Sequence, residues 1–109
     1  MDFNEYQKWA RTTAQYPDAG KNLIYPILGL CGESGEIAEK IKKIIRNDGG
    51  VMSPDKRTEL SKELGDVLWY VATIASELNV TLDDIARLNK EKLESRKARD
   101  VIKSAGDNR

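Results

Sequence analysis

Two pairs of acidic residues stand three positions apart in stretches whose apolar spacing is typical of helices. The pairs are Glu33 with Glu36, and Glu63 with Asp66. Residues three apart on a helix share a face, so each pair presents two carboxylates in one direction. If the two helices lie side by side, four carboxylates converge and repel one another unless a cation joins them. The pattern therefore predicts a site for a hard divalent cation such as Mg²⁺ or Mn²⁺.

The same helix faces continue into residues that can contact a ligand. Lys40 follows Glu36 by four positions, and Tyr70 follows Asp66 by four. A third set repeats this spacing further along the chain: Asn89, Lys92 and Arg96. Cations and amides bind phosphate oxygens well. Beside a metal site they indicate cleavage of a phosphoanhydride, in which a bound ion polarises a phosphoryl oxygen and one carboxylate accepts a proton from water.

Composition narrows the classes of function. The chain has 18 basic and 18 acidic residues, and this balance argues against a partner that is a nucleic acid polymer. It has no histidine, which excludes His-ligated zinc sites and Ser-His or Cys-His nucleophile pairs. No apolar stretch is long enough to span a membrane and no signal peptide is evident, so we expect a cytoplasmic protein. The single Cys31 has apolar neighbours and is expected to be buried.

The elements that must position these residues are predicted to be four helices. Asp2, Ser53 and Thr81 are suited to cap helix N-termini, and Asn79 is suited to end one. The expected helices cover approximately residues 3–16, 23–46, 54–78 and 82–99. At 109 residues, we expect one all-α domain over residues 1–99, followed by a C-terminal tail at 100–109. Apolar stripes on the second and third helices predict a four-helix bundle that is completed by oligomerisation.

Several further residues have a structural and a functional interpretation. Trp9 lies among polar neighbours and is a candidate for stacking on a substrate base, whereas Trp69 is expected to pack in the core or a subunit interface. Gly29, Gly32 and Gly35 recur every three residues, which predicts a face that a neighbouring helix or a ligand approaches closely.

Three segments together match the pattern of one known family. They are Gly32-Glu33-Ser34-Gly35-Glu36, then Glu63-Leu64-Gly65-Asp66-Val67-Leu68, then Asn89-Lys90-Glu91-Lys92-Leu93 with Arg96. In these segments, and over nearly its whole length, the chain resembles the MazG-type all-α nucleoside triphosphate pyrophosphohydrolases. Gly32 stands where longer relatives carry a further acid.

The resemblance implies Mg²⁺-dependent cleavage of a nucleoside or deoxynucleoside triphosphate between its α- and β-phosphates. The products would be a monophosphate and pyrophosphate, in cleansing or balance of the nucleotide pool. It implies that the four acids ligate the metal, that one of them orients the attacking water, and that the active form is a homodimer or a dimer of dimers. It also implies substrate contacts from Asn89, Lys92 and Arg96 at phosphate or sugar, and from Tyr70 at sugar or base.

Two other interpretations stay open at this point. The acids could form solvated helix faces with ordinary ion pairs, such as Glu36 with Lys40, in a non-catalytic helical oligomeric module. A phosphoribosyl-ATP pyrophosphohydrolase would use the same acid chemistry on a related fold. The sequence also leaves open the preferred base and sugar, canonical or damaged nucleotide, dimer or tetramer, the number of ions and the identity of the general base.

Overall fold

The computed structural model describes residues 1–99, and the predicted tail at residues 100–109 lies outside the described residues. Within the described part the chain is helical, without strands. The elements are α1 (Phe3–Arg11), α2 (Ile24–Asn47), α3 (Pro54–Glu77) and α4 (Leu82–Ala98). The prediction of an all-α fold is confirmed, and α2, α3 and α4 begin and end close to their predicted limits. Helix α1 is shorter than expected, because a loop begins well before Pro17.

The predicted helix limits have local causes. Asp2, Ser53 and Thr81 each accept a hydrogen bond from the backbone N–H three residues later, with donor–acceptor distances of 2.8, 3.1 and 3.0 Å. These bonds satisfy N–H groups that have no partner inside a helix. At the other end of α3, Asn79 adopts a left-handed conformation with φ of 58°. Asparagine tolerates this conformation better than most residues, so the chain turns there into α4.

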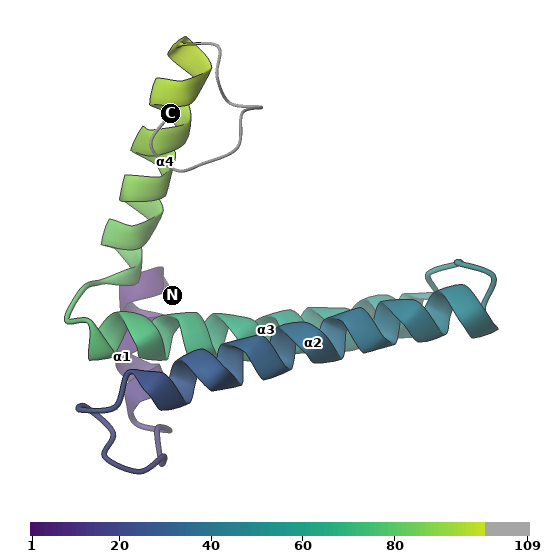
Figure 1. The fold of residues 1–109 in the computed structure, drawn as a ribbon, viewed down its shortest axis with the longest axis horizontal. Helices are drawn as coiled ribbons and strands as arrows, with labels where there is room; N and C mark the ends of the chain where they lie inside the picture. The colour runs from purple at the N-terminus through teal and green to yellow at the C-terminus, as the bar shows by residue number, and fades with distance from the viewer. Residues whose placement is uncertain (100–109) are drawn as a thin grey trace.

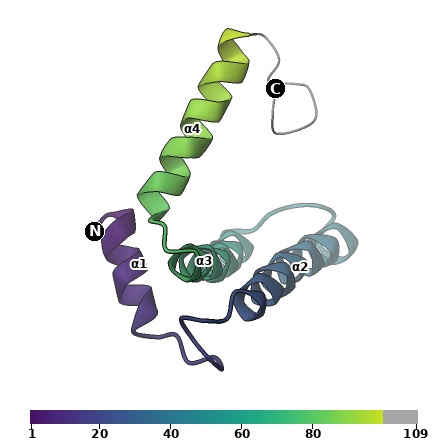
Figure 2. The same cartoon turned by 60° about the vertical axis from the view of Figure 1, so that its left-hand side comes forward.

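Helices α2 and α3 form a long antiparallel pair, and the other two helices gather at one end of it (Figure 1). Helix α1 packs across α3, while α4 projects away from the α2–α3 pair (Figure 2). The radius of gyration is 16.8 Å, whereas a compact domain of this length has about 13 Å. One chain therefore does not close a four-helix bundle by itself.

The core is small and lies where α1, α3 and α4 meet. Its buried residues are Ala10, Ala72, Ala75 and Leu82, with Tyr6, Trp69 and Val71 packed against them. Three of the four buried residues are alanines, which let the helix backbones approach closely. Trp69 thus belongs to the core margin, where its indole N–H donates a hydrogen bond to the Thr13 hydroxyl at 2.7 Å.

Gln7 fixes the turn between α3 and α4. Its buried amide donates hydrogen bonds to the Ser76 hydroxyl at 3.1 Å and to the Val80 carbonyl at 2.9 Å. Its carbonyl oxygen accepts a bond from the N–H of Leu82 at 2.8 Å. One side chain of α1 therefore satisfies polar groups on both sides of the turn from which α4 departs.

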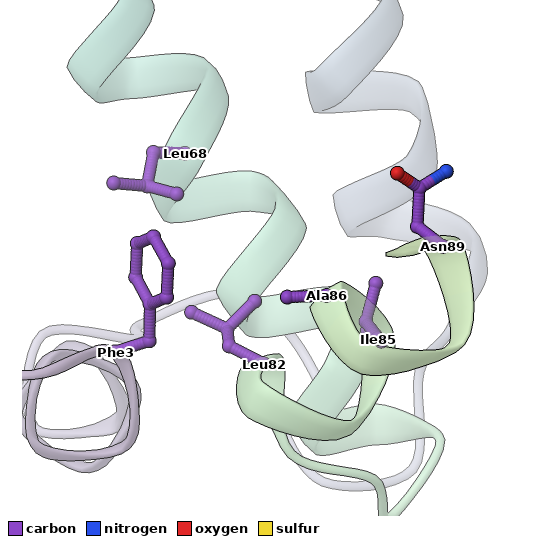
Figure 3. A pocket seen from close by; sticks show the side chains of 6 residues that line it. All are labelled: Phe3, Leu68, Leu82, Ile85, Ala86 and Asn89. Atoms are coloured by element: carbon purple, nitrogen blue, oxygen red, sulfur yellow. The ribbon is translucent and has the colours of Figure 1, made fainter. Parts of the chain in front are cut away.

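Much apolar surface remains exposed in the single chain. Ile45, Leu64 and Leu88 are 64%, 59% and 65% exposed, respectively. A groove between α1, α3 and α4 is lined by Phe3, Leu68, Leu82, Ile85, Ala86 and Asn89 (Figure 3). No helix of the described residues is long and apolar enough to cross a membrane.

One expectation about α2 is wrong for the described chain, and the expected close approach to the glycine row occurs at Gly29. Cys31 is exposed, because it lies on a part of α2 that no other described helix covers. Gly32 and Gly35 have no neighbour within 4 Å of a Cβ built on them, so only Gly29 of the predicted glycine row is closely approached.

Candidate metal centre

The antiparallel packing of α2 and α3 brings acids from both predicted pairs together. Glu33, Glu36 and Glu63 each offer a carboxylate oxygen, and these oxygens lie within 4.8 Å of one another. We call these three residues the acid cluster. Asp66 is not in this group, but it stands one turn after Glu63 on α3 and its charge acts on Glu33. The cluster is therefore assembled from residues that are far apart in sequence.

The surroundings of Glu33 in the acid cluster shift the pKa of its carboxyl. Burial raises the pKa of its carboxyl from 4.5 to about 7, with further contributions from the negative charges of Glu36, Asp66 and Glu63 and from a hydrogen-bond contact with Glu63. Burial and the neighbouring charges both disfavour the charged form, since water is excluded and the neighbours are like-charged. A cation among these oxygens would reverse the second cause.

The oxygen atoms themselves fit a hard cation. The Oε2 atoms of Glu33 and Glu63 are buried and have no hydrogen-bond partner. A buried carboxylate oxygen without a partner is costly, and most such atoms in folded proteins are hydrogen-bonded. A set of carboxylate oxygens from two facing helices is the donor type that Mg²⁺ and Mn²⁺ prefer. Three of the four predicted acids therefore form a donor set whose chemistry fits such a cation.

Lys40 stands at one end of the acid cluster. Its ammonium lies 3.9 Å from Glu63 and 4.0 Å from Glu59, both on α3. Among the described ion pairs, Lys40 thus contacts acids across the helix pair rather than Glu36 on its own helix. The ammonium group is partly exposed and neutralises only part of the cluster's charge.

Tyr70 stands on the other side of the acid cluster, against the backbone of α2. A Cβ added at Gly29 would lie 2.1 Å from the Tyr70 ring, so only glycine leaves room for this contact. The pKa of the Tyr70 hydroxyl is raised by burial and then by the charges of Glu33, Tyr25, Asp66 and Glu36. Gly29 therefore allows the Tyr70 ring to lie close to the acids.

The remaining predicted contacts lie outside the acid cluster. Trp9 is 56% exposed on α1, with its ring centroid 6.1 Å from that of Tyr6. Asn89 and Lys92 line grooves along α4 with apolar neighbours, and Arg96 is buried. The three α4 residues lie apart because α4 leaves the α2–α3 pair after the turn at Asn79 (Figure 1).

The position of Asn89 illustrates this separation. It shares its groove with Leu68 of α3 (Figure 3). Leu68 follows Glu63, the α3 member of the acid cluster, by five residues, which places it about 140° away around the helix. Asn89 and the acid cluster therefore face different sides of α3 within one chain.

A second buried carboxylate, Glu77, was not singled out by the sequence analysis. Its side chain is 2% exposed and accepts hydrogen bonds from the Tyr16 hydroxyl and from the backbone N–H groups of Gly20 and Asn22, the latter two at 2.7 and 3.0 Å. The Arg11 guanidinium lies 3.5 Å away. Burial acts to raise the pKa of Glu77, but these partners outweigh it and the pKa is lowered.

Glu77 thereby ties the loop between α1 and α2 to the end of α3. The loop needs left-handed backbone at Asp18 and Gly20, with φ of 54° and 98°. Tyr16 from this loop stacks on Tyr25 at the start of α2, with ring centroids 5.3 Å apart and an interplanar angle of 18°. In the sequence, the position of Glu77 seven residues after Tyr70 indicates only that the two share a face of α3, because its partners lie more than 50 residues away.

An all-α chain whose two long helices share a cluster of carboxylates is the arrangement that the sequence pattern predicts. The profile of the MazG nucleotide pyrophosphohydrolase domain matches residues 25–100, which contain all four acids. This match covers more than half of the 109 residues, so the chain belongs to the MazG nucleotide pyrophosphohydrolase family.

A phage protein is similar over the full length. The chain is 48% identical, over 114 aligned positions, to the Gene 37 protein of Mycobacterium phage L5, and the alignment covers 100% of both chains. No solved structure matches the chain.

Proposed function

We propose that this protein is a Mg²⁺-dependent nucleoside triphosphate pyrophosphohydrolase. It cleaves a nucleoside or deoxynucleoside triphosphate to the monophosphate and pyrophosphate, in cleansing or balance of the nucleotide pool. The observation that carries the proposal is the acid cluster with its two buried, unpartnered carboxylate oxygens. Membership of the MazG family supports it.

In this proposal the four acids have two roles, metal binding and proton acceptance. Glu33, Glu36 and Glu63, with Asp66, hold Mg²⁺ or Mn²⁺, which when bound neutralises polyphosphate charge and polarises a phosphoryl oxygen. One of the four carboxylates accepts a proton from the attacking water, because no histidine is available for that task.

Other side chains bind the substrate. Lys40 supplies a positive charge to the phosphates from one end of the acid cluster. Tyr70 lies beside the sugar or base at the other end.

We further propose that two or four copies assemble into the active form. The exposed apolar side chains on α2, α3 and α4 exceed what a stable monomer usually leaves in water. Assembly would also bring Trp9, Asn89, Lys92 and Arg96 of one copy toward the substrate at another. This arrangement reconciles their proposed substrate contacts with their distance from the acid cluster in one chain.

The test is pyrophosphate release from a panel of canonical NTPs and dNTPs, with phosphoribosyl-ATP included, in Mg²⁺ and after chelation. We expect metal-dependent release, reduced at least about 100-fold in Glu36→Gln and in Asp66→Asn. Glu39→Gln is the matched control, since Glu39 is an exposed acid of α2 that pairs with Lys42 at 2.8 Å.

Mg²⁺-induced thermal stabilisation gives a readout that is independent of turnover. It should be present in the wild type and in Glu39→Gln, and weak in Glu36→Gln. Hydrolysis of phosphoribosyl-ATP alone would reassign the substrate. Absence of both turnover and cation binding would indicate a non-catalytic helical module instead.

A further inference from the structure

The face of α2 that meets α3 changes character along its length. Its residues follow one another at steps of three and four: Tyr25, Gly29, Glu33, Glu36 and Lys40. Residues at this spacing share one face of a helix. Residues at the same spacing on α3 run the other way: Glu77, Thr73, Tyr70, Asp66, Glu63 and Glu59. The seam between the helices thus has an aromatic end, an acidic middle and an end with a lysine.

At the aromatic end, the ring of Tyr25 is held in place by the stacked ring of Tyr16. Tyr25 is 47% exposed, yet one face of its ring is covered by the stacked ring of Tyr16. Tyr16 is itself buried, and its hydroxyl is bound between Glu77 and Arg11. Tyr25 therefore presents an exposed surface on a ring whose other side is held by a fixed network.

The distance between Tyr25 and the acid cluster is similar to the length of a nucleotide. Tyr25 precedes Glu33 by eight residues, which is about 12 Å along the helix axis. A nucleoside monophosphate spans a comparable length from its base to its phosphate. The Tyr70 ring, seated on Gly29, lies between these two points. Lys40, on the far side of the acids, is placed for the terminal phosphates.

We propose that Tyr25 is a base-stacking residue, that Glu77 positions it through Tyr16, and that the substrate lies along the seam with its base at Tyr25 and its terminal phosphate at Lys40. This inference rests on the proposed function and adds the direction of the substrate and a wall of its base site. Every base has a flat face, so such a wall contributes affinity for all bases. Discrimination among bases then depends on other groups.

The test compares KM and kcat of three variants on the dNTP that the wild type hydrolyses best. Tyr25→Ala should raise KM about tenfold with little change in kcat, because it removes stacking but no reacting group. Tyr25→Phe should restore a KM close to that of the wild type, since it keeps the ring. Ile24→Ala is the matched control: it removes a neighbouring side chain that is 71% exposed, and should leave KM unchanged.

The role of Glu77 is tested by its coupling to Tyr25. Glu77→Gln should raise KM, and the double variant with Tyr25→Ala should bind no more weakly than Tyr25→Ala alone. Circular dichroism at the assay temperature separates this effect from unfolding, which would lower the active fraction rather than raise KM. Because Glu77→Gln is expected to weaken the fold, Tyr16→Phe serves as a milder variant that keeps the stacked ring and removes only the hydroxyl.

The outcomes separate this inference from the function on which it rests. A wild type that turns over dNTPs, with a KM for Tyr25→Ala equal to that of Ile24→Ala, would overturn the base-stacking assignment and leave the function standing. If Trp9→Ala raises KM instead, the base lies against α1. Binding can be measured separately with dNTP analogues in which a methylene group replaces the oxygen between the α- and β-phosphates, so that they cannot be cleaved there. A wild type that neither turns over dNTPs nor binds these analogues would overturn both proposals together.

Discussion

Glu33 on α2 and Glu77 on α3 are both carboxylates with little access to water, yet their surroundings are opposite. Glu77 is surrounded by donors: a tyrosine hydroxyl, two backbone N–H groups and a guanidinium. Glu33 is surrounded by other carboxylates, and its buried Oε2 has no partner. The pKa of Glu77 is accordingly lowered, whereas that of Glu33 is raised to about 7.

The difference shows how one helix seam can serve two purposes. At the Glu77 end the chain supplies hydrogen-bond donors and a positive charge, so the folded state favours the ionised carboxylate and removal of the carboxylate would leave its partners unsatisfied. At the Glu33 end the chain supplies more negative charge, so the fold alone leaves the site unfavourable. A buried group that its own chain leaves unsatisfied is a candidate for binding something else.

The largest effect is expected from Glu77→Gln, which should lower the free energy of unfolding by about 3 kcal/mol. The amide cannot accept hydrogen bonds as the carboxylate does, and it leaves Arg11 without its counter-charge. Urea unfolding followed by circular dichroism measures the loss. A decrease no larger than that of the exposed control Glu39→Gln would mean that the two buried carboxylates do not differ as described.

Glu33→Gln should have the opposite sign in metal-free protein. It is expected to raise the free energy of unfolding by about 2 kcal/mol at about pH 8, allowing for partial screening by solvent. The cause is the raised pKa, since the folded wild type resists losing a proton that the unfolded chain loses near 4.5. Between these values the folded state binds more protons than the unfolded state, so wild-type stability falls as pH rises through about 7.

The pH dependence provides the control for this prediction. Below pH 4.5 Glu33 is protonated in both states, so the advantage of Glu33→Gln should vanish there. Urea unfolding of both proteins in the presence of a chelator, at acidic and at alkaline pH, measures this difference in the free energy of unfolding. An advantage that is the same at both pH values would show that the substitution improves packing rather than relieving charge repulsion.

The smallest effect is expected from Lys40→Met, which should lower the metal-free stability by about 0.5 kcal/mol. Lys40 is the cation beside the acid cluster, as Arg11 is the cation beside Glu77. Its side chain is partly exposed, and its contacts of 3.9 and 4.0 Å are long for ion pairs. Urea unfolding at low and high salt checks this value. A loss comparable to that of Glu77→Gln would mean that Lys40 already satisfies the acid cluster.

The helices and the meeting of the acids could be predicted from the sequence because both depend on local spacing. Asp2, Ser53 and Thr81 cap helices through bonds that reach only three residues along the chain. Glu33 and Glu63 lie on faces set by the helical repeat, and a short connection between two long helices favours an antiparallel pair.

The Glu77 network and the course of α4 depend on long-range contacts and could not be predicted this way. Glu77 binds a loop that precedes it by more than 50 residues, and this loop relies on left-handed backbone at Asp18. The exposure of Cys31 has a similar origin, since apolar neighbours in sequence do not show whether another helix covers them. The direction of α4 is set by a turn whose partners come from α1.

Gln7 helps to set the angle between α3 and α4, because its side chain bonds to groups on both sides of that turn. Helix α4 has 17 residues, and its length is therefore about 25 Å. A rotation of about 10° at the turn would move its far end by about 4 Å, which is more than the length of a hydrogen bond. The hydrogen bonds of the Gln7 amide oppose such a rotation. The position of the far end of α4 relative to the α2–α3 pair thus depends on a glutamine near the start of the sequence.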